Sequence, residues 1–271
     1  MTTVWSWANL GDDSFRQYNI KQYWLLLSVL SVIKFNPEYK RVFVTDKETY
    51  DFMCLKGWDS LFTEIKVVDF TTTEYGNLYD IHLYAWSKLY SYGLIDDDMI
   101  VLDIDVVFVK PFVIKDKNKI SGRPYNHYHH YKHSPKKSLH LRDKWRFIDI
   151  HQQHIDDCGY NMYHMEQDSL CYQGSPVYIP KGYGKFIQSE IIDHIKNVES
   201  IYNGLVPDYS FYAIEEEYPL AEIAKRLTGY GFVDTSCYKH GFIYRAQRNI
   251  TKGFDVPESM LGINVFEKYL Q

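Results

Sequence analysis

The sequence predicts an α/β protein with a Rossmann-like, mostly parallel sheet flanked by helices. Strand-like and helix-like segments alternate over residues 3–112, and this alternation is typical of βαβ units in a doubly wound sheet. Residues 99–109 are almost entirely apolar, as expected for a strand that is buried on both faces at the centre of such a sheet. The pattern after residue 112 is less regular.

The elements of the first half follow from local signals. The first predicted helix ends before Asn36-Pro37, because a residue that precedes proline disfavours the helical conformation. Gly57 ends the second helix, and Gly93 ends the third. The predicted strands cover 3–7, 41–45, 64–68 and 99–109, and the predicted helices cover 14–34, 47–56 and 81–92.

The second half has fewer clear elements. Residues 121–165 are polar, aromatic and irregular, and a strand at 170–179 is interrupted at Gly174-Ser175-Pro176. Helices are expected at 185–198 and 215–227, and a last strand begins at 241–245. Because no linker is visible, we expect residues 1–271 to form a single domain with two halves, 1–112 and 113–271.

The composition excludes several classes of protein. The hydrophobic fraction is 45% and the charged fraction is 24%, which is ordinary for a globular protein in water. The longest apolar run, Trp24–Ile33, is too short to span a bilayer, and the N-terminal residues do not resemble a signal peptide. The four cysteines are scattered, which argues against a disulfide framework and a structural zinc site. We therefore expect a soluble, reduced, cytoplasmic protein.

Two aspartates interrupt the apolar run. On a strand, Asp103 and Asp105 would point to the same side, and Ile104 would point to the other. Two adjacent carboxylates are costly to bury unless a cation compensates their charge. Mg²⁺ and Mn²⁺ prefer such oxygen ligands and also bridge to phosphates. The alternative is a strand end that emerges into solvent, but the apolar residues 106–109 place the pair inside the element.

The order of these features resembles a known family. A strand near the N-terminus, two further α/β units, a helix with Trp86-Ser87-Lys88-Leu89 and the Asp103-Ile104-Asp105 strand are similar to the GT-A glycosyltransferases, in particular glycogenin-like and related nucleotide-sugar transferases. The resemblance covers residues 3–112 well and the remainder loosely. It implies a nucleotide-sugar-binding half at 1–112 and an acceptor-binding half at 113–271.

The resemblance also implies roles for individual residues. Asp103 would contact the donor ribose or a Mn²⁺ or Mg²⁺ ion, and Asp105 would ligate that ion directly. Lys88 would face the donor phosphates or these carboxylates, although it could also be a solvated helix lysine. His240 would be a third metal ligand, with a surface histidine as the alternative.

Further donor contacts would come from the ends of the first two strands. Trp5, Ser6 and Trp7 would lie against the nucleotide base, where an indole could stack, whereas a core tryptophan is the alternative. Asp46 would contact the base or ribose. The donor expected from the resemblance is a UDP-sugar.

Catalysis would need groups from the second half. Candidate carboxylates are Asp168 and the triplet Glu215-Glu216-Glu217, of which Glu215 and Glu216 are the candidates for a catalytic base. The triplet has a structural alternative, because acidic residues favour a helix N-terminus. The pattern does not distinguish an inverting from a retaining reaction.

The segment 121–154 is unusually basic. In a chain with a net charge of −5, it holds seven Lys or Arg residues, two Asp residues and seven of the eleven histidines. Basic residues interleaved with aromatic ones suit a polyanion that carries bases, so the acceptor could be hydroxymethylated DNA, as for the sugar-transferring enzymes of some phages. A lid that closes over the donor diphosphate is the alternative. The candidate acceptor contacts are Arg123, Lys136, Lys137 and Arg142.

Two other functions fit part of the pattern. Leu102-Asp103-Ile104-Asp105-Val106-Val107 also fits the nucleophile motif of haloacid-dehalogenase-type phosphatases, but that motif normally lies on the first strand of its domain. A non-catalytic protein that binds a nucleotide or polyanion is the second alternative. A phage-encoded enzyme would act in the host cytoplasm.

Overall fold

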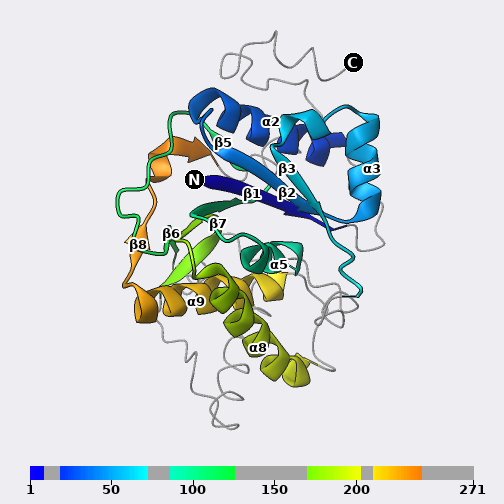
Figure 1. The fold of residues 1–271 in the computed structure, drawn as a ribbon. Coiled ribbons are helices and arrows are strands. Elements are labelled where there is room, and N and C mark those ends of the chain that lie inside the picture. Colours follow the sequence, from blue (N-terminus) through cyan, green and yellow to red (C-terminus); the bar gives the residue numbers. More distant parts are fainter. Residues whose placement is uncertain (9–18, 73–85, 126–169, 203–209, 240–271) are drawn as a thin grey trace, which may run out of the picture.

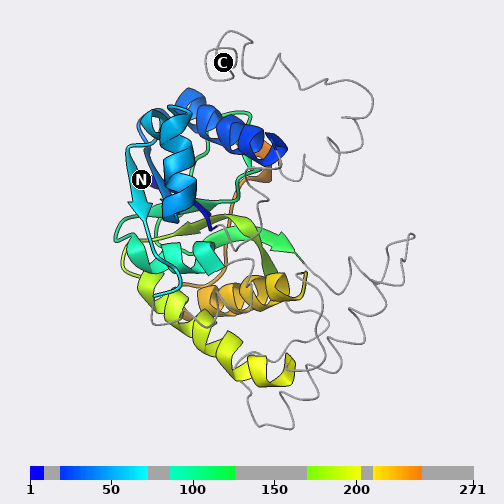
Figure 2. The ribbon, with the colours of Figure 1, turned by 90° about the vertical axis from the view of Figure 1, so that its right-hand side faces the viewer.

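A computed structural model describes residues 1–8, 19–72, 86–125, 170–202 and 210–239. Their elements form three layers, with a central sheet covered by helices on both faces (Figures 1 and 2). The predicted α/β class, with a mostly parallel sheet flanked by helices, is confirmed. No helix within the described ranges combines the length and the apolar character that a membrane crossing requires.

The sheet of the described residues has seven strands in the order β3-β2-β1-β4-β7-β6-β8. β1, β2, β3 and β4 are parallel neighbours, and β7 is antiparallel to both β4 and β6. β6 and β8 are parallel to each other, so β7 is the strand that runs against the rest of the sheet. The strands are β1 (Thr2–Trp7), β2 (Lys40–Thr45), β3 (Glu64–Val67), β4 (Met99–Leu102), β6 (Ser121–Tyr125), β7 (Cys171–Ile179) and β8 (Gly231–Phe232).

The helices divide between the two faces of the sheet. α2 (Asn19–Phe35) and α3 (Lys47–Leu55) cover one face, and α5 (Trp86–Leu94), α8 (Gly184–Tyr202) and α9 (Ser210–Leu227) cover the other (Figures 1 and 2). Two short 3-10 helices, η1 (Asp59–Leu61) and η3 (Thr235–Cys237), lie in connections. β5 (Val107–Phe108) and β9 (Tyr238–Lys239) form a separate antiparallel pair.

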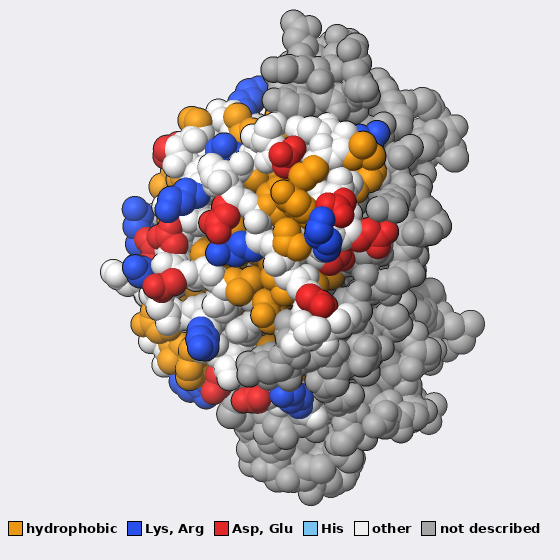
Figure 3. Space-filling model, turned by 45° about the vertical axis from the view of Figure 1, so that its right-hand side comes forward, with side chains coloured by type: hydrophobic (Ala, Val, Ile, Leu, Met, Phe, Trp, Pro, Cys, Tyr) orange, Lys and Arg blue, Asp and Glu red, His pale blue; other side chains and the backbone are white. Residues whose placement is uncertain are grey.

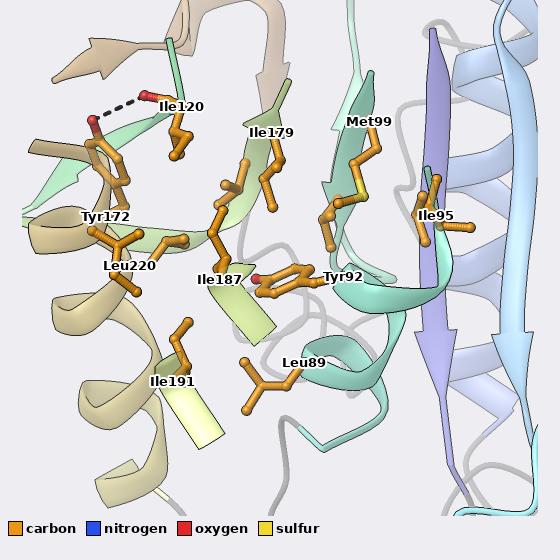
Figure 4. Packing of buried hydrophobic residues seen from close by; sticks show 14 of the residues in the cluster. Leu89, Tyr92, Ile95, Met99, Ile120, Tyr172, Ile179, Ile187, Ile191 and Leu220 are labelled. Carbon is orange, nitrogen blue, oxygen red and sulfur yellow. Dashed lines mark hydrogen bonds between the residues drawn. The ribbon is translucent and has the colours of Figure 1, made fainter. Parts of the chain in front are cut away.

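Side chains that alternate along the central strands build a core on each side. On β1, Val4 belongs to the core beneath α5, α8 and α9, and Trp5 belongs to the core beneath α2. Both side chains are fully buried, because β1 lies between two parallel strands and under helices on both faces. Figure 4 shows the first core, where Tyr92 of α5, Ile187 of α8 and Leu220 of α9 converge.

Most predicted elements of the first half are confirmed within one or two residues. Asp46 caps α3 by accepting the Thr49 N–H at 2.8 Å, and Gly57 follows the helix at a φ of 68°. Such a left-handed residue after a helix favours glycine. The predicted helix at 14–34 is confirmed from residue 19 onward, and its start lies outside the described residues.

Other expectations were wrong. The strand predicted at 99–109 is two short strands in different sheets, β4 and β5, with a turn between them. α5 continues through Gly93 and ends at Leu94. α9 begins at Ser210, so the glutamate triplet lies inside a helix rather than at its N-terminus. The helix dipole therefore does not explain the triplet.

The region around residue 121 also differs from its prediction. Ser121–Tyr125 forms β6 within the main sheet, although the segment has an irregular sequence. β7 runs without a break from Cys171 to Ile179, through the predicted interruption and a cis Ser175-Pro176 bond. Sheet pairing on both sides holds these segments extended, and local propensity does not record that pairing. The strand expected at 241–245 lies outside the described residues.

Candidate functional site

Acidic residues follow the strands at one edge of the sheet. Because β1, β2, β3 and β4 are parallel, their carboxyl ends meet at the same edge. Asp46 follows β2, Asp69 lies just after β3, and Asp103 follows β4. Ligands of open α/β sheets bind beyond these strand ends. This edge is therefore the candidate site.

Asp103 and Asp105 lie in the turn that leaves β4. The strand ends at Leu102, and the Val106 N–H donates to the Asp103 carbonyl at 3.1 Å. The placement of the two carboxylates inside one continuous strand was therefore wrong. The apolar residues after them are buried because β5 pairs with β9 and packs near α2. The Asp103 side chain is 34% exposed, whereas Asp105 as a residue is 9% exposed.

Lys88 pairs with the first of these carboxylates. Its ammonium Nζ lies 2.9 Å from Asp103 Oδ1 and donates a second hydrogen bond to the Gly174 carbonyl, also at 2.9 Å. The Lys88 side chain is 12% exposed, so the solvated-lysine alternative is wrong. Trp86 and Leu89 on the same helix are fully buried, and this packing holds α5 against the sheet. The expected contact of Lys88 with the aspartates is therefore present at Asp103.

β7 supplies two more contacts beside Asp103. The Asp103 N–H donates to Ser175 Oγ at 2.6 Å, which joins the turn to β7. The Gly174 N–H donates to Glu217 Oε1 at 3.0 Å. α5, β7 and α9 therefore meet at this turn through polar contacts. The sequence pattern gave Ser175 no functional role and named Glu217 only as a member of the acidic triplet, although the break in apolar character at Gly174-Ser175-Pro176 marked the place.

Helix α2 holds the other end of the turn. Ser28 Oγ donates to the Val106 carbonyl at 2.5 Å and accepts the Trp5 indole N–H at 2.8 Å. One turn further along the helix, Ser31 also contacts the chain after the turn, since its Oγ accepts the Phe108 N–H at 3.0 Å. Both serines are fully buried. The stacking role considered for Trp5 is not supported, since its fully buried indole is a core group.

The remaining donor-side candidates lie at the ends of β1 and β2. Trp7 is 9% exposed and Ser6 is half-buried. Asp46 lines a hollow of about 490 Å³ between the ends of β2 and β3. The Asp69 carboxylate in the same hollow accepts hydrogen bonds from Thr71, and these lower its pKa. The hollow is lined by Asp46, Lys47, Glu48, Val67, Val68, Asp69, Phe70 and Thr71.

Arg123 is the one acceptor-side candidate within the described residues. It lies on β6, pairs with Gln173 of β7 and is half-buried. Burial raises the pKa of Tyr238 to about 12, and the nearby Arg123 guanidinium acts in the opposite direction. Asp168, Lys136, Lys137, Arg142 and His240 lie outside the described residues, and so do the side chains of Glu215 and Glu216.

The charges at the site suit a cation and an anion together. Two carboxylates in a partly buried turn can ligate a hard divalent cation, and the Lys88 ammonium can contact a phosphate. Among the described residues, no three or more His, Cys, Asp or Glu side chains group as metal ligands. On the face shown in Figure 3, Lys and Arg side chains are interspersed with Asp and Glu side chains. This face therefore has no extended patch of a single charge.

Comparisons with known proteins found structural likenesses and no sequence family. No family model matches the chain, and no curated protein matches it. A structure of PaToxG glycosyltransferase is 14% identical, with a TM-score of 0.43, and the match covers 83% of this chain and 67% of that one. Mouse xyloside xylosyltransferase 1 in its apo form is 12% identical, with a TM-score of 0.42 and coverages of 86% and 84%.

Proposed function

We propose that this protein is a metal-dependent glycosyltransferase of the GT-A type, which moves a sugar from a nucleotide-sugar donor to an acceptor hydroxyl. The observation that carries the proposal is the contact between Lys88 and Asp103 at the carboxyl edge of the sheet. An ammonium that pairs with one carboxylate of an acidic turn suits a diphosphate bridged by a divalent cation. The haloacid-dehalogenase-type alternative is not favoured, because the motif follows the fourth strand of the chain.

The proposed metal ligands are Asp103, Asp105 and His240. The first two supply hard oxygen donors within one turn, which fits Mn²⁺ or Mg²⁺. The pairing of β5 with β9 supports a contribution from His240, because Val107 pairs with Lys239 and His240 is the next residue of the sequence. When bound, the cation would stabilise the negative charge that develops on the departing diphosphate.

The chain's own groups would do the rest of the donor chemistry. Lys88, held by Gly174, would donate to a phosphate oxygen as the nucleoside diphosphate leaves, and this contact would be strongest at the transition state. Asp46, Ser6 and Trp7 would contribute at the nucleoside end. A UDP-sugar is the donor that we propose to test first.

The acceptor side is proposed from the sequence. Asp168, Glu215 and Glu216 are the candidate catalytic carboxylates. Arg123, Lys136, Lys137 and Arg142 are the candidate acceptor contacts, and hydroxymethylated DNA is the acceptor that their basic, aromatic context suggests.

A donor panel tests the proposed activity. Wild-type protein is incubated with Mn²⁺ and a set of sugar nucleotides, and release of the nucleoside diphosphate is measured. We expect release from at least one donor, a fall of about 100-fold or more in Asp105→Asn, and little change in Asp116→Asn, an exposed loop carboxylate. Equal activity in Asp105→Asn would exclude the metal site. Rapid hydrolysis of a phosphomonoester that Asp103→Asn abolishes would favour a phosphatase.

A second experiment tests the DNA acceptor. Binding to duplex DNA should weaken steeply with salt, because neutralised phosphates release counterions. The double charge reversal Lys136→Glu, Lys137→Glu should weaken it further, and a mass increase on hydroxymethylated DNA should accompany donor consumption. Binding that is absent or insensitive to salt would contradict this acceptor.

A further inference from the structure

The backbone N–H and C=O groups of Gly174 both form hydrogen bonds with side chains. β7 pairs with β4 through residues 177–179 and with β6 through residues 171–173 and Tyr178. Gly174 is buried and belongs to neither ladder. Its N–H donates to Glu217 Oε1, and its carbonyl accepts from Lys88 Nζ. Two helices therefore satisfy with side chains what a sheet normally satisfies with backbone groups.

The same short segment contacts Asp103 by two routes. Lys88 connects the Gly174 carbonyl to the Asp103 carboxylate, at 2.9 Å on each side. Ser175, the next residue, accepts the Asp103 N–H. A displacement of Gly174 would therefore move both the ammonium that faces Asp103 and the hydroxyl that holds its backbone.

The helix that carries Glu217 is firmly seated on β7. Leu220, three residues later, is fully buried in the core that also contains Tyr172 of β7 (Figure 4). Tyr172 precedes Gly174 by two residues. The packing of α9 on β7 thus fixes the position from which Glu217 accepts the Gly174 N–H.

We propose that Glu217 is a positioning residue for the Lys88–Asp103 pair and acts through Gly174. This inference rests on the proposed donor site. Glu217 holds the N–H of Gly174 so that the Gly174 carbonyl directs Lys88 toward Asp103 and the diphosphate. Its role requires a hydrogen-bond acceptor and does not require a negative charge or a proton transfer.

The Gln and Ala variants separate this role from others. Glu217→Gln and Glu217→Ala both remove the charge, but only the glutamine keeps an oxygen that can accept the Gly174 N–H. We expect Glu217→Ala to weaken the binding of UDP in saturating Mn²⁺ by about tenfold, as loss of outer-shell partners does at metal sites, and Glu217→Gln to stay close to wild type. Equal losses in both variants would assign Glu217 an electrostatic or acid–base role and overturn the proposal.

A double-mutant cycle with Lys88→Met completes the test. Calorimetric UDP affinity is measured for both single variants and the double variant, with Glu222→Ala on the same helix as the control. If Glu217 acts through Lys88, Glu217→Ala should change the affinity by less than about twofold in the Lys88→Met background. Additive effects would make Glu217 a structural residue and overturn the positioning role.

Urea unfolding of the same variants separates a failure of the Glu217–Lys88 coupling from a failure of the proposed donor site. Non-additive unfolding midpoints for Glu217→Ala and Lys88→Met would show that the two residues are coupled through Gly174, whether or not the protein binds UDP. Additive midpoints would overturn the coupling itself. Wild-type protein that binds neither Mn²⁺ nor UDP would overturn the proposed donor site, and the positioning role would fall with it.

Discussion

The Ser175 hydroxyl accepts the N–H of Asp103 at 2.6 Å, at the point where β4 ends. Ser175 lies on β7, and Asp103 directly follows β4, the antiparallel neighbour of β7. The contact therefore ties the start of the acidic turn to a strand from the second half of the chain. At the far end of the turn, Ser28 of α2 holds the Val106 carbonyl. The carboxylates of Asp103 and Asp105 are thus carried by backbone that is held on both sides.

Replacement of Lys88 by methionine should impair activity more than stability. Methionine keeps the apolar stem but leaves the Asp103 carboxylate without its ammonium partner. Because Asp103 is 34% exposed, water would compensate part of the loss, and we expect unfolding to become easier by about 1–2 kcal/mol. Release of nucleoside diphosphate should fall by about 100-fold.

The matched control is Lys225→Met, which breaks the ion pair between Lys225 and Glu222. The Lys225 side chain is 59% exposed. It should change the free energy of unfolding by less than about 0.5 kcal/mol. Urea titrations and the donor assay measure both effects. Full activity of Lys88→Met would exclude a role for this lysine at the donor phosphates.

Ser28→Ala should be strongly destabilising for so small a change. It removes one hydroxyl but deprives two buried groups, the Trp5 indole N–H and the Val106 carbonyl, of a partner. At about 1–3 kcal/mol for each buried unsatisfied group, we expect a loss of about 2–4 kcal/mol in the free energy of unfolding. Ser60→Ala, which removes an exposed hydroxyl bonded to the Gly57 carbonyl, is the control and should have little effect.

Two glycines should respond to alanine for different reasons. At Gly184, a Cβ would lie 2.2 Å from the Tyr92 carbonyl oxygen, so α8 could not keep its contact with α5. We expect Gly184→Ala to cost about 2–3 kcal/mol of stability. At Gly57 the space is open and φ is +68°, so the cost of Gly57→Ala is backbone strain of about 1 kcal/mol. Thermal and urea unfolding should rank the two in this order, and the reverse order would contradict the close approach of the helices.

Stability should fall at alkaline pH, partly because of Tyr172. Burial raises the pKa of its phenol from 10.0 to about 12, while the hydroxyl donates to the Ile120 carbonyl and accepts the Gly231 N–H (Figure 4). The folded state thus holds the proton more tightly than the unfolded state does. Its stabilising effect is complete below pH 10 and is lost as the pH rises toward about 12.

The variant Tyr172→Phe cannot ionise at this position. At neutral pH it should lose about 1–2 kcal/mol with its two hydrogen bonds. Its stability should decline less steeply above pH 10, where the phenol of the unfolded wild-type chain ionises while the folded protein still holds the proton. Urea unfolding at a series of pH values measures both effects. Identical slopes for the two proteins would exclude Tyr172 from the alkaline transition.

Much of the fold could be predicted because its signals are local. Alternating apolar and polar segments marked the strands and helices of the first half, and Gly57 marked the end of α3. The same logic failed where pairing decides the structure. β6 has an irregular sequence yet is extended between β7 and β8, and the single apolar run at 99–109 divides between two sheets.

At the candidate site, the main charged groups can be recognised in the sequence, but only long-range packing brings them into contact with their partners. Asp103 and Asp105 were identifiable because charged residues in an apolar segment need a compensating partner, and Lys88 was named from the resemblance to the GT-A glycosyltransferases. Their partners Ser175, Gly174 and Glu217 are separated from them by tens of residues, and no local pattern connects such positions. The antiparallel placement of β7 beside β4, and the packing of α9 on β7, bring these groups to the turn. The turn that carries the two carboxylates is therefore fixed, and the charge of Asp103 is partly neutralised, only when β7, α5 and α9 are in place.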